Sequence, residues 1–431
     1  MALSRIASTF VLSLALVFAG CASGLQPAAT PESVGFSSER LMTMATAVQD
    51  GVAKREIPGA VVLLVRRSKT AYFQSFGFRD PETNAPMTND VIFRIASMTK
   101  PITTTAAMIL VDEGRLNLSD PVSRYLPEFK SLLVGVERKD AAGNASLALE
   151  PALREMTVLD LMRHTSGLTY GFIGKSQVKD RYNAAKATEP GQSNAEMAAK
   201  LARLPLQNQP GTIWDYSMST DVLGRIVEVV SGMELEQFFA QRIFKPLGMT
   251  DSGFWVSDPG KRARIAATLV DPATGKPAAL PDKTVKSWQS GGGGLVSTAG
   301  DYARFCQMLL NAGELDGVRI LSRRSVELMT RDQLPAGIPT NSSKIPALDV
   351  RQEAGNGFGL GFMVRTDEGR NAIRGSVGDY TWSGLLGTYF WIDPKQELFG
   401  IVLFQTPPSA FVRSAGYWVR IRNLAYEALA N

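Results

Sequence analysis

Strand-like segments lie near both ends of the sequence and are scarce between them. Near the start, the apolar run 60–65 and the segment 71–77 flank a polar link, which predicts a β-hairpin whose first strand is buried on both faces. Strand patterns return near the end, at residues 357–364, 382–392 and 398–405. Both ends are therefore expected to share one sheet, which predicts a sheet domain split between residues 33–114 and 291–431.

The segment between these two parts has mainly helical spacing. Apolar residues recur three and four positions apart in residues 158–163, 195–204, 220–230 and 235–243. Residues 115–290 are therefore predicted to form a mainly helical inserted domain. Two further helices, over residues 37–54 and 409–429, are expected to flank the sheet, so the fold class is α/β plus all-α. The junction of the two domains is a common location for a pocket.

Composition excludes several classes of function. The 431 residues are 45% hydrophobic and 20% charged, which is typical of a globular protein with a large core. The 46 basic and 41 acidic residues are spread along the chain, so no nucleic-acid partner is expected. One histidine and two cysteines form no ligand cluster, so no metal, no other cofactor and no disulfide framework are predicted. Cys306 is interpreted as a buried free thiol, and the glycines 291–294 as a mobile crossing loop.

The first twenty residues have the pattern of a signal peptide. Arg5 precedes the apolar run 6–19, which is too short to span a bilayer comfortably. Residues 18–21 resemble a bacterial lipobox, so Cys21 is predicted to be lipidated and to provide a membrane tether, with 21–32 as a spacer. The chain would then be secreted across the inner membrane as a periplasmic or membrane-anchored lipoprotein. Cleavage near Ala22 by ordinary signal peptidase and an uncleaved tether remain open.

The strongest candidate for chemistry is the stretch from Ser97 to Pro101, which leads into the apolar run 102–111. A helix that begins at about Ser97 brings Ser97 and Lys100 onto one face. Pro101 supports that start, because a proline is tolerated only where the helical N–H groups are unpaired. The positive helix end favours a nucleophile that develops negative charge, and the amine can take its proton. A solvated lysine has a pKa of about 10.4, so this role requires burial or a cationic neighbour.

Two other side chains are candidates for a proton acceptor. His164 is the one histidine, but the sequence contains no Gly-x-Ser-x-Gly, so a Ser-His-Asp hydrolase is disfavoured and His164 is interpreted as a structural, hydrogen-bonded residue. Tyr216 follows Pro210-Gly211 and precedes a predicted helix. A phenol becomes a usable base only beside a cation, which Lys100 would provide. A simple packing role is the alternative for Tyr216.

Several motifs together resemble the serine β-lactamase-like hydrolases. They are the Ser97–Lys100 tetrapeptide, the segment 120–127, the segment 164–168 and the tyrosine motif 214–218, in matching order and spacing. The resemblance covers nearly all of residues 33–429 and is greatest to the family VIII carboxylesterases, which share the fold of class C β-lactamases and DD-peptidases. It implies an antiparallel sheet flanked by helices, with Ser97 as acylated nucleophile, Lys100 as its activating partner and Tyr216 as proton relay to the leaving group.

The sequence departs from the β-lactamases at two motifs. Their Lys-Thr-Gly is absent, and Trp382-Ser383-Gly384-Leu385 stands on the expected strand, similar to the Trp-Gly-Gly of esterases. The resemblance implies that Trp382 and Gly384 line the substrate site and that the N–H groups of Leu385 and Ser97 form an oxyanion hole. Met218 stands where β-lactamases have the asparagine of Tyr-x-Asn. Both changes replace polar recognition by apolar surface, which favours substrates without a carboxylate.

These observations predict a serine carboxylesterase that cleaves short to medium acyl esters through an acyl-enzyme on Ser97, with a small-molecule ester as its partner. A β-lactamase or D-alanyl-D-alanine peptidase is the first alternative. A non-catalytic protein that binds cell-wall peptides is the second, against which the intact Ser97, Lys100 and Tyr216 set argues. The oligomeric state does not follow from the sequence.

Overall fold

The protein is described by a computed structural model that covers residues 25–139, 145–271, 274–286, 288–341 and 348–430, together with Ala141 and Gly143. The predicted signal peptide and Cys21 lie outside the described residues. Residues 26–28, which fall in the predicted spacer, are paired with the backbone of Thr70. No helix in the described part of the chain is both long and apolar enough to cross a bilayer.

An antiparallel sheet of eight strands in the order β12-β13-β14-β15-β16-β1-β2-β3 forms the centre of the molecule. Strands β1 and β16 join the two ends of the chain, with Val61 opposite Leu403 and Arg66 opposite Leu398. The expected sheet from both ends of the chain is therefore confirmed. Its strands are β1 (Gly59–Arg66), β2 (Lys69–Asp80), β3 (Ala85–Pro86), β12 (Asn356–Phe358), β13 (Met363–Arg365), β14 (Tyr380–Gly384), β15 (Thr388–Asp393) and β16 (Leu398–Leu403).

Two segments that the sequence predicted as single strands are hairpins. Residues 357–364 contain the turn between β12 and β13, and residues 382–392 contain the turn between β14 and β15. Glycines permit both reversals of the chain. Gly361 and Gly387 have φ angles of +85° and +99°, which residues with a β-carbon rarely adopt. The apolar residues on either side of each turn obscured the reversal in the sequence.

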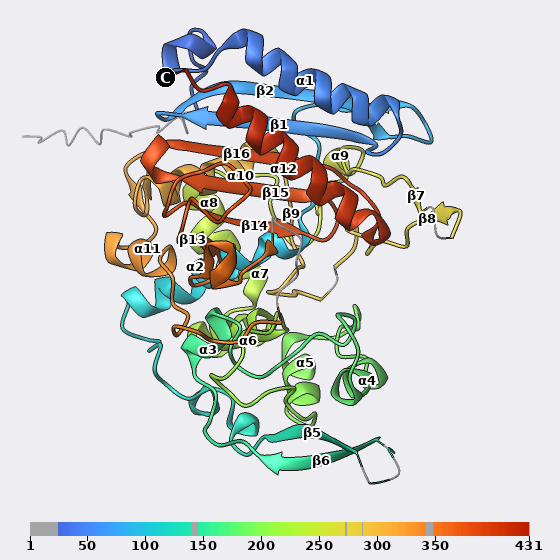
Figure 1. The fold of residues 1–431 in the computed structure, drawn as a ribbon, viewed down its shortest axis with the longest axis vertical. Coiled ribbons are helices and arrows are strands. Elements are labelled where there is room, and N and C mark those ends of the chain that lie inside the picture. The colour runs from blue at the N-terminus through green and yellow to red at the C-terminus, as the bar shows by residue number, and fades with distance from the viewer. Residues whose placement is uncertain are drawn as a thin grey trace, which may run out of the picture.

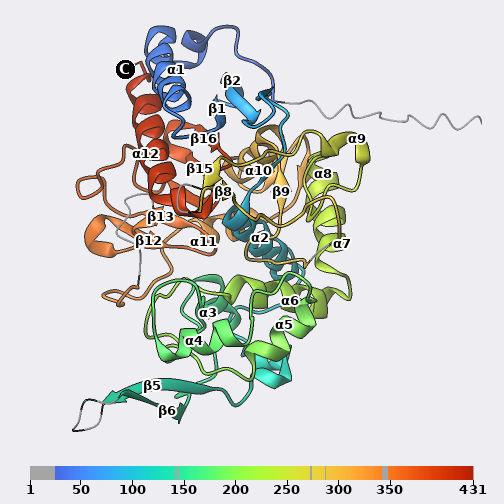
Figure 2. The same cartoon turned by 90° about the vertical axis from the view of Figure 1, so that its right-hand side faces the viewer.

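Helices cover both faces of the sheet (Figures 1 and 2). Helices α1 (Ser38–Ala53) and α12 (Phe411–Glu427) lie together on one face, and α2 (Thr99–Asp112) and α10 (Ala299–Leu310) lie on the other. Strand β1 is buried on both sides, since Val62 and Leu64 pack into the core beneath α1 while Val61 and Leu63 pack into the core around α2. This arrangement explains the uninterrupted apolar run of β1. The thiol of Cys306 is free and buried on α10, as predicted.

The inserted part of the chain is mainly helical, but it also contains the hairpin β5–β6, which the sequence analysis missed, and the short strand pair β7–β8. The hairpin lies at the end of the molecule farthest from α1 (Figure 1), and its residues are mostly exposed, so they form no apolar run. The predicted helix over residues 235–243 is split, because α7 passes into a π-helical turn at Ala240–Phe244. The elements here are β5 (Leu133–Lys139), β6 (Ala145–Pro151), α3 (Val158–Met162), α4 (Gln177–Ala184), α5 (Asn194–Leu201), α6 (Ser219–Ser231), α7 (Leu235–Phe239), α8 (Lys245–Leu247), α9 (Pro259–Arg262), β7 (Val270–Asp271) and β8 (Lys276–Pro277).

Short elements complete the fold around the site. Strand β4 (Phe93–Arg94) directly precedes the Ser97 turn, and β9 (Val296–Ser297) directly follows the glycine run 291–294. The two strands pair with each other and thereby hold these two segments side by side. The remaining elements are β10 (Glu314–Leu315), β11 (Val318–Arg319) and α11 (Arg323–Met329).

Candidate active site

Ser97 lies in a 3-10 turn, Ala96–Met98, immediately before α2. The turn is fixed from two sides, because Thr99 Oγ1 donates to the Ala96 carbonyl at 2.7 Å and Tyr302 donates to the Met98 carbonyl at 3.0 Å. Pro101 is the third residue of α2, where an N–H would be unpaired in any case. Ser97 is partly exposed while the α2 residues that follow it are buried, so its hydroxyl is the accessible group of this turn.

Lys100 is 1% exposed, and its Nζ has three oxygen partners. These are Ser97 Oγ at 3.2 Å, the Tyr170 hydroxyl at 3.1 Å and the Gly292 carbonyl at 2.6 Å. Tyr170 in turn donates to Asp221 at 3.3 Å, which leaves its oxygen free to accept from Lys100. The amine is thus held against the Ser97 hydroxyl by groups from two other segments of the chain.

Asp221 on α6 holds both Tyr170 and Gly292, the two residues that accept from Lys100 besides Ser97. It accepts hydrogen bonds from Ser290 Oγ at 2.5 Å and from the Gly292 N–H at 3.0 Å. Burial raises the pKa of Asp221, although the charge of Lys100 opposes the rise. Burial and the neighbouring Asp221 also raise the pKa of Tyr170 well above 10, so Tyr170 remains a neutral phenol.

Sequence reasoning missed Tyr170, Asp221 and Gly292. Tyr170 stands two residues after the 164–168 motif, and this proximity is the one signal that could have found it. Asp221 lies inside a helix and Gly292 inside a glycine run, and neither position carries a pattern that points to a lysine more than a hundred residues away.

The glycine run 291–294 is packed tightly between α2 and α6, in contrast to the mobile loop that we expected. A β-carbon at Gly292 would lie 2.8 Å from the Tyr170 hydroxyl and closer still to Asp221 Oδ2. A β-carbon at Gly294 would lie 2.7 Å from the Phe254 ring. The backbone itself is held by Thr103 Oγ1, which donates to the Gly291 carbonyl at 2.7 Å. Glycine is required at positions 292 and 294 because other side chains occupy the place of a β-carbon there.

Tyr216 lies beside Lys100 through its ring. Lys100 Nζ is 4.5 Å from the ring centroid, within the range of a cation–π contact. The Tyr216 hydroxyl is buried and has no hydrogen-bond partner among the described residues. The structure therefore brings the Tyr216 ring to the lysine but leaves its hydroxyl available, while Tyr170 makes the hydroxyl–amine contact.

His164 is fully buried and lies outside hydrogen-bond reach of Ser97. Its Nδ1 is 3.2 Å from Ser217 Oγ, and Ser217 is itself 1% exposed. Burial and the charge of Lys100 lower the pKa of His164 well below 6.5, so the imidazole is neutral. These contacts agree with a structural histidine and give no accessible serine for a Ser-His-Asp mechanism.

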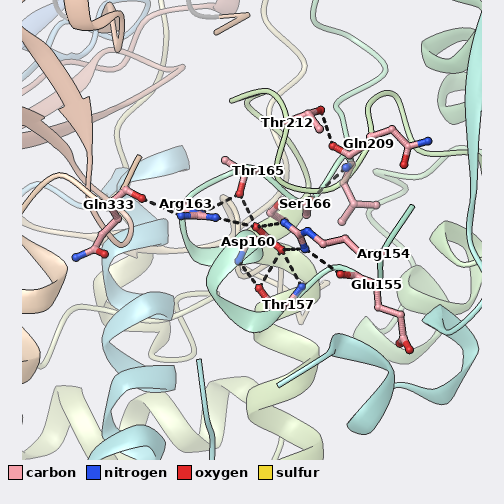
Figure 3. A network of polar contacts seen from close by, with 12 residues as sticks. Arg154, Glu155, Thr157, Asp160, Arg163, Thr165, Ser166, Gln209, Thr212 and Gln333 are labelled. Atoms are coloured by element: carbon pink, nitrogen blue, oxygen red, sulfur yellow. Dashed lines mark hydrogen bonds and ion pairs between the residues drawn. The ribbon is translucent and has the colours of Figure 1, made fainter. Parts of the chain in front are cut away.

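The buried carboxylate of Asp160 is hydrogen-bonded to Arg163 and Thr165 (Figure 3). Asp160 accepts from Arg154 at 2.6 Å, from Arg163 at 3.2 Å and from Thr165 Oγ1 at 2.8 Å. Burial alone would raise the pKa of Asp160, but hydrogen bonds from Arg154, from the Thr157 N–H and from Thr165, together with the charge of Arg154, bring it to about 2. Because Arg163 and Thr165 flank His164, the network fixes the segment that carries the histidine.

Strand β14 forms the other side of the site. Gly384 packs against the turn before Ser97, since a β-carbon there would overlap the Ile95 carbonyl, and Thr388 Oγ1 donates to the same carbonyl at 3.0 Å. Leu385 follows the strand and is 36% exposed. Neither the Ser97 N–H nor the Leu385 N–H has a hydrogen-bond acceptor within the described part of the chain.

Aromatic rings continue from this strand across the site in one row. Trp382 packs on Tyr216 with centroids 5.4 Å apart, Tyr216 on Tyr170 at 5.4 Å, and Tyr170 on Phe172 at 4.9 Å. Phe172 ends the row and is 57% exposed. Met218, in contrast, is completely buried in the core, so the expectation that it adds apolar surface to the site is wrong. The cause is its place at the start of α6, which points it inward.

Among the described residues, no group of three or more histidine, cysteine, aspartate or glutamate side chains is arranged to hold a metal ion. The polar groups of the site are a serine, an amine, two phenols and backbone amides. Such a set is suited to nucleophilic attack and proton transfer at an acyl group.

Comparisons with known proteins agree with this chemistry. An uncharacterized protein of Mycobacterium tuberculosis (strain CDC 1551 / Oshkosh) is 40% identical over 368 residues, which cover 83% of this chain and 88% of that protein. Esterase EstB of Burkholderia gladioli is 29% identical over 399 residues, 87% of this chain and 93% of EstB. The solved structure of EstCE1, a hydrolase with promiscuous acyltransferase activity, has a TM-score of 0.74 and 25% identity, and covers 90% of this chain and 98% of EstCE1.

EstCE1 and this chain share the fold that the sequence predicted, a β-lactamase/DD-peptidase-like fold with an antiparallel sheet flanked by helices. The profile of the Beta-lactamase family matches residues 44–423, which includes both parts of the sheet and the inserted helices. The chain therefore belongs to the β-lactamase family, in a branch with esterase and acyltransferase relatives.

Proposed function

We propose that the protein is a serine carboxylesterase of the family VIII type, which cleaves neutral short to medium acyl esters through an acyl-enzyme on Ser97. The observation that carries the proposal is the 3.2 Å contact between Lys100 Nζ and Ser97 Oγ, in a site where Trp382 replaces the lysine of Lys-Thr-Gly. The esterase relatives give it further support.

The partners of Lys100 suit a proton acceptor. In its neutral form the amine has two hydrogens, which donate to Gly292 and Tyr170, and one lone pair, which faces the Ser97 hydroxyl. When Ser97 Oγ attacks the ester carbonyl carbon, its proton moves to that lone pair. The resulting ammonium has three hydrogens and three acceptors, so it remains fully hydrogen-bonded, and the buried Asp221 balances its charge.

The rest of the reaction uses groups that are free in the structure. The N–H groups of Ser97 and Leu385 would hold the carbonyl oxygen as it becomes negative, and removal of one such donor typically costs about 3 kcal/mol. Tyr216 would pass a proton from Lys100 to the departing alkoxide, which leaves as the alcohol. Water then attacks the acyl-enzyme, gives up a proton along the same path and releases the carboxylic acid and free Ser97.

The wall of the site favours esters without a charge. β-Lactams carry a carboxylate, which a lysine or arginine binds well and an indole does not. Trp382, Tyr216, Tyr170 and Phe172 instead present a row of aromatic rings. A β-lactamase or D-alanyl peptidase activity therefore has less support than ester hydrolysis.

Acyl transfer to an alcohol is a second candidate, which is favoured by the similarity to EstCE1, a hydrolase with promiscuous acyltransferase activity. The acyl-enzyme is the same in both reactions. The two outcomes differ only in whether water or an alcohol attacks it, so both can be measured in one assay with added alcohol.

The decisive test compares kcat/KM for p-nitrophenyl butyrate and for nitrocefin, with Ser97→Ala as control. We expect rapid ester turnover that the control abolishes, and much slower turnover of nitrocefin. A preference for nitrocefin of about tenfold, or about 1.4 kcal/mol of transition-state stabilisation, would contradict the esterase proposal.

We also propose export and a membrane tether through lipidated Cys21, which rests on residues 18–21 of the sequence alone. Incorporation of labelled palmitate into the full chain in a bacterial host, lost in Cys21→Ser, is the expected result. Release of the unmodified chain into the periplasm in both cases would contradict the tether.

A further inference from the structure

His164 contacts the residues on both sides of Tyr216. Its carbonyl accepts from the Asp215 N–H at 3.0 Å, and its Nδ1 lies 3.2 Å from Ser217 Oγ. The imidazole also packs on the Tyr216 ring with centroids 5.0 Å apart. His164 has a φ angle of +58°, which non-glycine residues rarely adopt, so its surroundings must hold it in this conformation.

Three serine hydroxyls continue the contact from the imidazole into the protein. Ser217 Oγ lies 2.7 Å from Ser219 Oγ, which lies 2.7 Å from Ser166 Oγ. The Leu168 N–H donates to Ser166 Oγ at 3.1 Å and closes the far end. None of the three serines is more than 1% exposed, and their hydroxyls have no further partners among the described residues.

The number of hydrogens fixes the direction of this serine chain, Ser166–Ser219–Ser217–His164. The serine chain contains three hydrogen bonds, Ser166–Ser219, Ser219–Ser217 and Ser217–His164, and three hydroxyl hydrogens to form them. Every hydroxyl therefore finds an acceptor only if Ser217 donates to an unprotonated Nδ1 of His164. If Nδ1 carried a hydrogen, that hydrogen would occupy one of these hydrogen bonds and leave a buried hydroxyl without an acceptor. An unsatisfied buried donor costs about 1–3 kcal/mol. A neutral His164 must then carry its hydrogen on Nε2.

The surroundings of Nε2 agree with this assignment. The atom is buried and has no hydrogen-bond partner in the described part of the chain. Three aromatic rings surround the imidazole, those of Tyr216, Phe358 and Trp214, with centroids at 5.0, 5.5 and 6.0 Å. An N–H group is attracted to aromatic faces, whereas a lone pair is repelled by them.

We propose that His164 is the positioning residue of Tyr216, held by the serine chain as a neutral imidazole with its hydrogen on Nε2. The His164 carbonyl accepts from the Asp215 N–H, and the His164 Nδ1 accepts from Ser217 Oγ. These two hydrogen bonds fix Tyr216, which lies between Asp215 and Ser217. The inference rests on the proposed role of Tyr216 as proton relay. It requires no contact between His164 and substrate.

The tautomer can be observed directly, because the chain has one histidine. In the purified protein labelled with 15N-histidine, we expect NMR signals of a protonated Nε2 and an unprotonated Nδ1, unchanged from about pH 5 to about pH 8. A protonated Nδ1, or titration near pH 6.5, would overturn the inference. This measurement needs no substrate, so it gives an answer even if ester hydrolysis fails, and an active esterase with the other tautomer would overturn only the inference.

Kinetics test the effect on Tyr216. Ser217→Ala removes the donor to Nδ1, and we expect kcat for p-nitrophenyl butyrate to fall about tenfold or more with little change in KM, together with a mixture of histidine tautomers. Ser217→Thr retains the hydroxyl and should restore both values. Ser166→Ala, at the far end of the serine chain, should keep the Nε2–H tautomer because Ser217 still donates to Nδ1.

A second pair of variants covers the case in which Ser217→Ala does not fold. His164→Asn keeps an acceptor toward Ser217 and tolerates the positive φ angle, whereas His164→Leu has neither property. We expect His164→Asn to retain at least several times the kcat of His164→Leu. Equal kcat in these two variants, or wild-type kcat in folded Ser217→Ala, would overturn the positioning role.

Discussion

At the scale of single residues, the amine of Lys100 has one oxygen acceptor for each hydrogen of its ammonium form. Two of these acceptors, Tyr170 and Gly292, were not expected from the sequence. Tyr170 donates to Asp221, and this bond orients its oxygen toward the lysine. Its hydroxyl therefore determines where the amine lies relative to Ser97.

Tyr170→Phe should lower kcat/KM for p-nitrophenyl butyrate about tenfold to a hundredfold. The variant removes a hydrogen bond to a charged amine, which is worth about 1.5–3 kcal/mol, and leaves the aromatic row in place. The matched control is Tyr182→Phe, because Tyr182 is also a buried tyrosine of the helical part but is not a partner of Lys100. Equal activity in the two variants would show that Tyr170 acts only through packing.

The local sequence pattern predicted the two site residues that are close along the chain, whereas the distant Tyr216 and Trp382 were found from motifs that resemble a known family. Ser97 and Lys100 are three residues apart, so helical geometry alone brings them together. The contacts that orient them come from Asp221 and Gly292, and these depend on how α6 and the glycine run pack against α2. No local pattern encodes such packing, which is why sequence reasoning identified Ser97 and Lys100 but not the groups that orient them.

At the scale of structural elements, the glycine run 291–294 joins α2 to α6. The Gly292 carbonyl accepts from Lys100 and its N–H donates to Asp221, so one peptide segment connects the two helices. The position has no room for a side chain, since the Tyr170 hydroxyl and Asp221 occupy the β-carbon direction.

Gly292→Ala is therefore expected to displace the carbonyl that holds Lys100 and to lower kcat about a hundredfold, because small displacements of catalytic groups have effects of this size. Gly293→Ala is the matched neighbour, since its β-carbon would meet nothing closer than 3.8 Å. We expect Gly293→Ala to keep a melting temperature close to that of the wild type. A Gly292→Ala enzyme with full kcat would show that the carbonyl is dispensable.

The buried Asp160 also holds the segment from Arg163 to Thr165 through hydrogen bonds (Figure 3). The pKa of Asp160 is about 2 in the folded protein against an ordinary value of 3.8, so the ionised form stabilises the fold. This stabilisation is complete above about pH 4, where Asp160 is ionised in both the folded and the unfolded state. It disappears as the pH falls through about 2, because Asp160 is then protonated in both states.

Asp160→Asn should thus lower the free energy of unfolding by about 3 kcal/mol at neutral pH, because two arginines lose their buried partner. The difference from the wild type should shrink between about pH 4 and about pH 2. Denaturant unfolding at several pH values measures it, with the exposed Asp50→Asn as control. A constant difference across this pH range would contradict the role assigned to the carboxylate.

At the scale of the whole molecule, the sequence was informative about architecture and weaker about connections. The two-sided apolar run of β1 correctly placed the first strand inside a sheet. Hairpins within 357–364 and 382–392 were missed because apolar residues continue through their turns. The exposed hairpin β5–β6 was missed for the opposite reason, since little of it is buried.

The aromatic row links the two parts of the molecule across the site. Trp382 belongs to the sheet, and Tyr216, Tyr170 and Phe172 belong to the inserted part, so in the proposed esterase substrate specificity would depend on how these parts meet. Phe172 is the exposed end of the row, and its exposure of 57% means that it contributes little to the stability of the fold. An ester with a longer acyl chain would gain most by covering this ring.

Phe172→Ala should therefore change selectivity and leave the chemistry intact. Each buried methylene contributes about 0.8 kcal/mol. If two methylenes of the acyl chain lose contact with the Phe172 ring, kcat/KM for p-nitrophenyl hexanoate should fall about tenfold relative to that for the acetate ester. The rate with acetate and the melting temperature should stay near those of the wild type. Phe78→Ala, which removes a partly exposed phenylalanine of β2, is the control. If the hexanoate-to-acetate ratio of Phe172→Ala equals that of Phe78→Ala, the acyl chain does not reach the outer end of the aromatic row, and specificity must be set closer to Trp382.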